Sequence, residues 1–214
     1  MEVIGAYEKS GYALVRGLVA PEVARAFMRG VKEDMGPTPI PLSRVSHHSV
    51  VLKRPAFEIY GNHYKPLSYF LWALTPVVSQ LTGRDLLPSY DYFRIYQRGD
   101  ICRVHTDRPS CEHSVSLTLE YSDGQPWALE VGKKRLEWHP GGDDFADEEY
   151  SSLPMQIGDA VLYQGVHYAH GRTVPNPNGW SAHLFLHYVD RDGPFGDHAF
   201  DRQVNLEKVN FSFG

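Results

Sequence analysis

The chain has 214 residues, which is enough for one sizeable domain and too short for two comfortable ones. Hydrophobic residues make up 42% and charged residues 22%, an ordinary globular composition that excludes an intrinsically disordered chain. The formal net charge of −5 speaks against a nucleic-acid or anionic-membrane partner that is held by charge alone.

The N-terminal third is expected to combine a short strand with two helices. Residues 11–17 have the composition of a strand. Pro21 suits the first position of a helix, because its missing N–H is not needed there, and apolar residues then recur at helical spacing through Val31. A second helix is expected over 67–81, with Gly83 near its end. Polar residues interrupt this apolar stretch, so it is too polar to span a bilayer.

From Tyr90 onward, short strand-like runs follow one another, and turn-forming residues separate them. The six runs are 92–96, 101–105, 114–120, 127–131, 160–163 and 180–189. Many short strands at close spacing predict a closed or sandwiched antiparallel sheet, such as a jelly roll. The prediction is one domain over 1–214, with an N-terminal strand and supporting helices (1–89), a jelly-roll core (90–190) and a C-terminal tail (191–214). The four tryptophans are expected in the core: Trp72, Trp127, Trp138 and Trp180.

His105 and Asp107 are two residues apart at the end of a predicted strand. The strand period of two puts both side chains on one face, where an imidazole and a carboxylate can bind one metal ion. A third ligand must come from a distant strand, and the segment 158–172 offers His167 and His170. Two histidines and one carboxylate on one face of an octahedron leave three positions open, which is the arrangement of non-haem Fe(II) oxygenases.

The frame around these residues resembles the prolyl-4-hydroxylase type of Fe(II)/2-oxoglutarate-dependent dioxygenase. In that family a strand with a tyrosine, here Tyr96, turns through a glycine, here Gly99, into the strand that ends in His-x-Asp. The run Gly-Asp-Ala at 158–160 resembles the family element that precedes the distal histidine. The resemblance implies a mainly β protein with flanking helices, folded as a double-stranded β-helix (jelly roll, cupin-like). It also implies a hydroxylase that uses Fe(II), 2-oxoglutarate and O2, with ascorbate helpful in vitro.

Carried over from the family, His105 and Asp107 are the first two iron ligands. For the third we prefer His170 to His167, because the family's distal histidine precedes a short strand and a turn, and the residues after His170 have that character. Asp107 occupies the position that a halide would need, so hydroxylation is favoured over halogenation.

The far carboxylate of 2-oxoglutarate is buried in such enzymes and must be paired with a cation. Family members usually supply an Arg or Lys from the strand after the distal histidine, but 173–190 contains neither and offers His183 and His187 instead. Cys102 also stands where the prolyl-hydroxylase type tends to have a tyrosine, three positions before the first histidine. The anchor must therefore come from elsewhere in the chain, or the cosubstrate differs.

Strand parity gives three candidates for this anchor. Arg172 lies two residues after the preferred third ligand, Arg94 shares a strand face with Tyr96, and Arg103 lies two residues before the first ligand. A bidentate guanidinium suits a carboxylate better than an ammonium does. We rank Arg172 first, then Arg94, then Arg103, and expect Tyr96 beside the cosubstrate.

The expected activity is hydroxylation of an unactivated C–H bond in a small molecule, such as an amino acid or a biosynthetic intermediate, because one small domain suits a small substrate. The alternative is a cupin-like isomerase or lyase that uses a divalent ion without O2, and the missing distal Arg or Lys favours it. A non-enzymatic binding module is the least favoured hypothesis. The identity of the substrate and the oligomeric state do not follow from the sequence.

Two features indicate a cytoplasmic protein. Cys102 and Cys111 are too few for a disulfide framework, which favours a reducing compartment. Residues 1–12 lack the basic and apolar regions of a signal peptide. From the net charge and the interrupted apolar stretch at 67–81, we expect no nucleic-acid partner and no membrane association.

Overall fold

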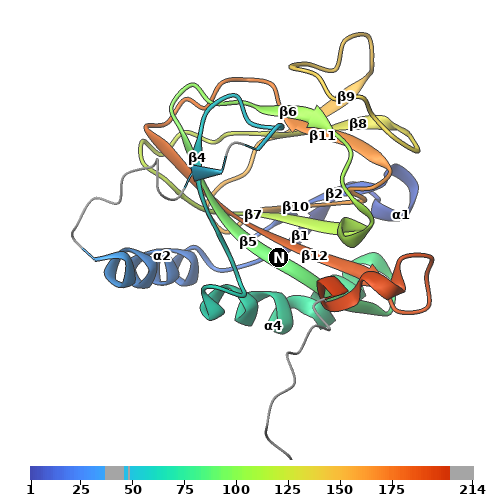
Figure 1. Ribbon diagram of the computed structural model, residues 1–214, viewed down its shortest axis with the longest axis horizontal. Coiled ribbons are helices and arrows are strands. Elements are labelled where there is room, and N and C mark those ends of the chain that lie inside the picture. Colours follow the sequence, from blue (N-terminus) through green and yellow to red (C-terminus); the bar gives the residue numbers. More distant parts are fainter. Residues whose placement is uncertain (37–45, 48, 203–214) are drawn as a thin grey trace, which may run out of the picture.

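The structure, a computed structural model, describes residues 1–36, 46–47 and 49–202. Two antiparallel sheets lie one above the other (Figure 1). The larger sheet has the order β1 (Glu2–Ile4), β2 (Tyr12–Arg16), β10 (Ala160–Tyr163), β7 (His113–Tyr121), β12 (Trp180–Asp190), β5 (Leu86–Gln97), β4 (Ala56–Tyr60) and β3 (Ser46–His47). The smaller sheet has the order β6 (Cys102–His105), β11 (Tyr168–Arg172), β8 (Leu129–Arg135) and β9 (Tyr150–Leu153).

From β5 onward the chain winds between the two sheets. β5 lies in the larger sheet, β6 in the smaller, β7 in the larger, β8 and β9 in the smaller, and β10, β11 and β12 alternate again. This winding is the double-stranded β-helix, so the predicted fold class is confirmed. These eight strands run from Leu86 to Asp190, and of the expected tail 191–214 only residues 191–202 are described.

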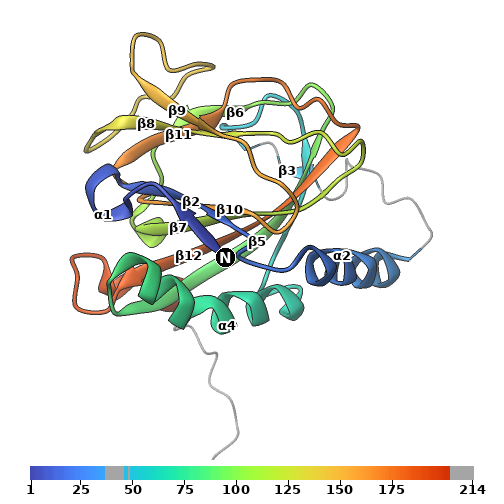
Figure 2. The same cartoon turned by 180° about the vertical axis from the view of Figure 1, so that it is seen from behind.

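The helices cover the outer face of the larger sheet. α2 (Pro21–Met35) and α4 (Lys65–Thr82) lie beneath it in Figure 1, and the view from behind in Figure 2 shows the same order of layers. As expected, Pro21 is the first residue of its helix, and Gly83 ends α4 with a left-handed φ of 66°. A short helix, α1 (Tyr7–Ser10), and two 3-10 segments, η1 (Pro109–Cys111) and η2 (Gly196–Arg202), complete the described elements. No described helix combines the length and apolarity that crossing a membrane requires.

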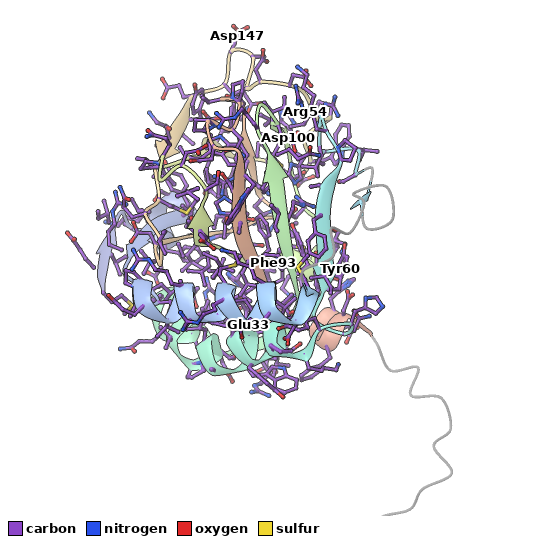
Figure 3. All side chains as sticks on the ribbon, turned by 90° about the vertical axis from the view of Figure 1, so that its left-hand side faces the viewer. Glu33, Arg54, Tyr60, Phe93, Asp100 and Asp147 are labelled. Carbon is purple, nitrogen blue, oxygen red and sulfur yellow. The ribbon has the colours of Figure 1, made fainter. Side chains whose placement is uncertain are left out.

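The main apolar core lies between the helices and the larger sheet. Leu71 and Val78 of α4 contribute to it, together with Phe93 of β5 (labelled in Figure 3) and Leu117 and Leu184 from the two central strands. The opposite face of the larger sheet turns toward the smaller sheet. The space between the sheets is therefore left for polar and aromatic side chains, which form the candidate site.

The expectation that all four tryptophans lie in the core is wrong for two of them. Trp127 is 2% exposed, but Trp72 and Trp138 are 56% and 71% exposed, and Trp180 is partly buried. Trp72 lies on the solvent-facing side of α4. A residue type that is usually buried gives no information about which side of an amphipathic helix it occupies.

Candidate metal centre and cosubstrate pocket

The smaller sheet brings two of the predicted ligands face to face. His105 at the end of β6 and His170 in β11 are direct partners in the antiparallel pairing of these strands. Asp107 follows two residues after His105, and one ligand atom from each of the three side chains lies within 4.8 Å of the others. Both imidazoles direct Nε2 to the carboxylate of Asp107, at 3.4 Å from Oδ1 for His105 and 3.4 Å from Oδ2 for His170.

Backbone carbonyls fix the orientation of both imidazoles. Nδ1 of His105 is 2.7 Å from the carbonyl oxygen of Arg103, and Nδ1 of His170 is 2.9 Å from that of Tyr168. A carbonyl oxygen only accepts, so each ring carries its proton on Nδ1 and leaves the Nε2 lone pair free when neutral. This is the second-sphere arrangement that orients histidines for metal binding.

The charge distribution of this group suits a divalent cation. Burial raises the pKa of Asp107, but the imidazoles of His170 and His105 lower it well below its ordinary value. Burial lowers the pKa of His170, and the Asp107 carboxylate raises it above its ordinary value. Oδ2 of Asp107 accepts no well-formed hydrogen bond although it is buried. Two Nε2 atoms and an anionic oxygen thus converge, with nitrogen and oxygen donors of the kind that bind Fe(II).

His167, the alternative third ligand, does not belong to this group. Its Nδ1 lies 3.4 Å from the carbonyl oxygen of Leu136, and burial together with the Arg135 charge lowers its pKa. The structure therefore brings together His105, Asp107 and His170, the three residues that sequence reasoning preferred.

Arg172 lies inside the barrel with almost no exposed surface, at 1%. It donates from Nη1 to the carbonyl of Trp127 at 2.8 Å and from Nη2 to the hydroxyl of Ser116 at 3.3 Å, and its Cζ lies 4.6 Å from the Trp127 ring centroid. Its Nε has no partner, and no carboxylate oxygen of the described residues lies within 4.0 Å of it. A buried guanidinium without a counter-ion is costly unless an anion binds beside it.

His183 lies beside Arg172. Its Nδ1 lies 3.3 Å from Nη2 of Arg172. Burial and the charges of Arg172 and Arg94 lower the pKa of His183 well below its ordinary value, so the ring is neutral and Nδ1 accepts from the guanidinium. A neutral histidine leaves the positive charge of Arg172 available for an anion.

Arg94 also points between the sheets, as strand parity predicts, but its charge is already compensated. Its Nη2 and Nε both lie 2.6 Å from Oε2 of Glu58, and both side chains are buried. Its Nη1 donates to the hydroxyl of Tyr96 at 3.1 Å. Arg103 forms a partly exposed ion pair with Asp143 at 2.7 Å. Of the three arginines that sequence reasoning considered, only Arg172 lacks a carboxylate partner among the described residues.

Sequence reasoning missed a second set of residues beside the metal group. Asp107, Cys111 and His187 also offer ligand atoms within 4.8 Å of one another. The His187 ring stacks on Tyr90 at a centroid distance of 4.5 Å, and its Nδ1 lies 2.8 Å from the hydroxyl of Ser114. Burial lowers the pKa of His187 to about 4, so the ring is neutral at pH 7. The alternation of His183, Phe185 and His187 along β12 was the available signal, because alternate residues of a strand share one face.

The sequence matches no protein-family model, and a search of curated proteins finds no match to it. Solved structures are similar. A prolyl-4-hydroxylase from Pseudomonas putida shares 13% identity over 86% of this chain and 95% of its own, with a TM-score of 0.59. HygX from Streptomyces hygroscopicus, solved with nickel, 2-oxoglutarate and hygromycin B, shares 9% identity over 86% of this chain and 84% of its own, with a TM-score of 0.63. The epimerase SnoN, solved with Fe3+, alpha-ketoglutarate and a nogalamycin compound, shares 12% identity over 86% of this chain and 80% of its own, with a TM-score of 0.59.

The chain thus has the double-stranded β-helix, and this fold brings His105, Asp107 and His170 together at one point. More particularly, it has the fold of the Fe(II)/2-oxoglutarate oxygenases, as the resemblance in the sequence implied.

Proposed function

We propose that this protein is an Fe(II)/2-oxoglutarate-dependent oxygenase that acts on a small molecule and hydroxylates an unactivated C–H bond. The observation that carries the proposal is the convergence of His105, Asp107 and His170 on one point inside this fold. His105 and His170 would hold the metal through Nε2, and Asp107 through its carboxylate. When bound, Fe(II) and 2-oxoglutarate would supply the oxidising chemistry with O2.

The chain's own residues hold this centre in place. The bonds from Nδ1 of each histidine to a carbonyl fix the imidazole planes, and the backbone N–H of Asp107 donates to the carbonyl of Gly165 at 2.8 Å. The ligands therefore need little rearrangement when a metal binds. Oxygen ligation by Asp107 leaves no place for a halide, which favours hydroxylation over halogenation.

Arg172 would pair with the far carboxylate of 2-oxoglutarate. Its buried and uncompensated charge supports this role, and the neutral His183 beside it does not compete for the anion. The isomerase or lyase alternative drew its support from the absence of Arg and Lys in 173–190. Arg172 removes that support, because it supplies a buried cation from β11, the preceding strand in the chain.

Two of the similar structures contain a further small molecule, hygromycin B in one and a nogalamycin compound in the other, which favours a small-molecule substrate. SnoN is an epimerase, so the same fold carries more than one reaction outcome. In this protein, hydroxylation predicts a product that is heavier by one oxygen atom, whereas epimerisation leaves the mass of the substrate unchanged.

The test measures succinate release from 2-oxoglutarate in the presence of Fe(II), ascorbate and pools of amino acids, amines and biosynthetic intermediates. We expect turnover that requires Fe(II), stops under anaerobic conditions and disappears in the His105→Ala and Asp107→Ala variants. The His167→Ala variant serves as the matched control and should keep turnover. Turnover that persists in His105→Ala, or failure of the protein to bind 2-oxoglutarate with Mn(II) in calorimetry, would contradict the proposal.

A further inference from the structure

A cavity of about 150 Å³ opens beside α4. It lies where the start of α4, the strand β5, the end of β4 and the segment η2 meet, and Figure 3 labels Tyr60 at the end of β4. By the volume of liquid water the cavity holds about five water molecules. It is therefore large enough for the polar group of a small organic molecule and part of its body.

The floor of the cavity contains a carboxylate without a counter-ion. Asp91 of β5 is 3% exposed, and its Oδ1 accepts no well-formed hydrogen bond. No lysine or arginine nitrogen lies within 4.0 Å of it in the part of the chain that the structure describes. Burial raises the pKa of Asp91 to about 6, although the Ser68 hydroxyl, the Lys65 charge and the Gly61 N–H lower it. A buried carboxylate of this kind gains stability when a cation binds beside it.

Aromatic side chains surround the entrance. Trp72 and Phe200 are 56% and 57% exposed, and both line the cavity together with Tyr60. Large aromatic surfaces gathered around a carboxylate are suited to a cation with an apolar body, because the ring faces attract positive charge. The backbone of Phe200 has a positive φ of 55°. The next residue, Asp201, forms an ion pair with Arg108 at 2.8 Å.

The cavity is separate from the metal group. Tyr90 lines the cavity and stacks on His187, which in turn lies beside Asp107. None of His105, Asp107 and His170 lines the cavity itself. Occupation of the cavity can be measured without any metal or 2-oxoglutarate, so it does not depend on the proposed oxygenase activity.

We propose that this cavity binds a small organic cation, a primary ammonium carried on an aromatic or apolar body. The ammonium group would donate to the Asp91 carboxylate and to the Ser68 hydroxyl, and the body would lie against Trp72 and Phe200. A primary ammonium has three donors, which suits this arrangement of oxygen acceptors. The exposed Lys65 also lines the cavity. Its own ammonium group therefore competes with an external cation for the site.

The test uses benzylamine as the cation and benzyl alcohol as its neutral isostere. Binding to the metal-free full-length protein is measured by calorimetry in phosphate buffer, which contains no amine. We expect benzylamine to bind at least ten-fold more tightly than benzyl alcohol, and Asp91→Asn to remove this difference. Trp72→Ala should weaken both probes several-fold. Asp85→Asn, at an exposed ion pair with Arg191, and Trp138→Ala, at an exposed tryptophan outside the cavity, are the matched controls and should bind as the wild type does.

Equal affinity for the two probes in the wild type, or an unchanged preference in Asp91→Asn, would overturn the proposal. The variant Lys65→Met separates the two occupants. If benzylamine binds only to Lys65→Met, then Lys65 fills the site and the proposal of an external ligand is wrong. Should Asp91→Asn fail to fold, the comparison of wild type, Trp72→Ala and Lys65→Met still decides the matter.

Discussion

Two arginines point into the space between the sheets, and their surroundings give them different functions. Arg94 is neutralised by Glu58, so it links β4 to β5 as a structural ion pair. Arg172 has polar neighbours but no carboxylate, and its Nε has no partner. Burial without compensation makes Arg172 the residue on which cosubstrate binding is expected to depend.

We predict that Arg172→Met weakens the binding of 2-oxoglutarate, measured by calorimetry with Mn(II), by about 30-fold or more. Loss of one partner of a buried charge pair costs about 2–5 kcal/mol, and each ~1.4 kcal/mol is a factor of ten in affinity. The affinity for Mn(II) alone should stay the same. Arg103→Gln, at the partly exposed pair with Asp143, is the control and should bind 2-oxoglutarate normally. Normal binding by Arg172→Met would show that the anchor lies elsewhere.

Among single residues, the sequence predicted those whose spacing along a strand places their side chains on the same face. His105 and Asp107 follow from the strand period, and Arg172 follows from its distance to His170. Glu58 could not be predicted, because it reaches Arg94 from a strand 36 positions earlier and nothing in the local sequence marks that pairing. The neutral state of His183 also depends on neighbours that only the folded chain supplies.

At the scale of elements, the loop between β10 and β11 determines where Asp107 lies. The carbonyl of Gly165 accepts from the backbone N–H of Asp107, and a Cβ atom at Gly165 would stand 2.4 Å from Oδ2 of Asp107. The same Cβ atom would stand 2.7 Å from the backbone oxygen of Cys111, so no side chain fits there unless both the carboxylate and this part of the backbone move. The glycine therefore allows the loop to approach the metal ligand closely.

We predict that Gly165→Ala folds but binds metal at least ten-fold more weakly, because the added methyl group displaces the carboxylate of Asp107 and the backbone at Cys111. Metal content after equilibrium dialysis measures the loss, and circular dichroism verifies the fold. Gly30→Ala in α2, where a Cβ atom meets nothing within 4 Å, is the matched control and should keep full metal affinity. Full affinity in Gly165→Ala would mean that the loop adjusts at little cost.

The longest strands were only partly predicted. The run 92–96 extends in the structure to Leu86–Gln97, because β12 pairs with β5 over nearly its whole length. Alternation in the sequence is broken near Pro88, so periodicity underestimated this strand. The strands β4 and β9 were not predicted, since their pairing with β5 and β8 is a contact between distant segments.

For the whole molecule, the ligands of the proposed centre come from β6, β11 and the segment after β6, and the proposed cosubstrate site around Arg172 adds residues from β7 and β12. Ligands that bind only the folded state raise its stability by mass action. The smaller and larger sheets should therefore be stabilised together when Mn(II) and 2-oxoglutarate bind.

We predict that Mn(II) and 2-oxoglutarate at about 100 times their dissociation constants raise the free energy of unfolding by roughly 2.7 kcal/mol for each ligand. For a chain of this length, that corresponds to a rise in Tm of roughly 5–10 °C per ligand. Differential scanning calorimetry measures the shift, and a chelator should reverse it. Asp107→Ala should show no shift with Mn(II). An equal shift in that variant would place the metal at another site.

The two histidines of the metal group are cross-strand partners, whereas Asp107 has already left the sheet. Hydrogen bonds between β6 and β11 thus set the separation of the imidazoles, and a sheet changes its strand spacing very little. Ions of different radius must then be accommodated almost entirely by the carboxylate and its loop. Selectivity between one divalent ion and another therefore depends on Asp107 and its loop. The barrel holds the two imidazole nitrogens of His105 and His170 at a constant separation.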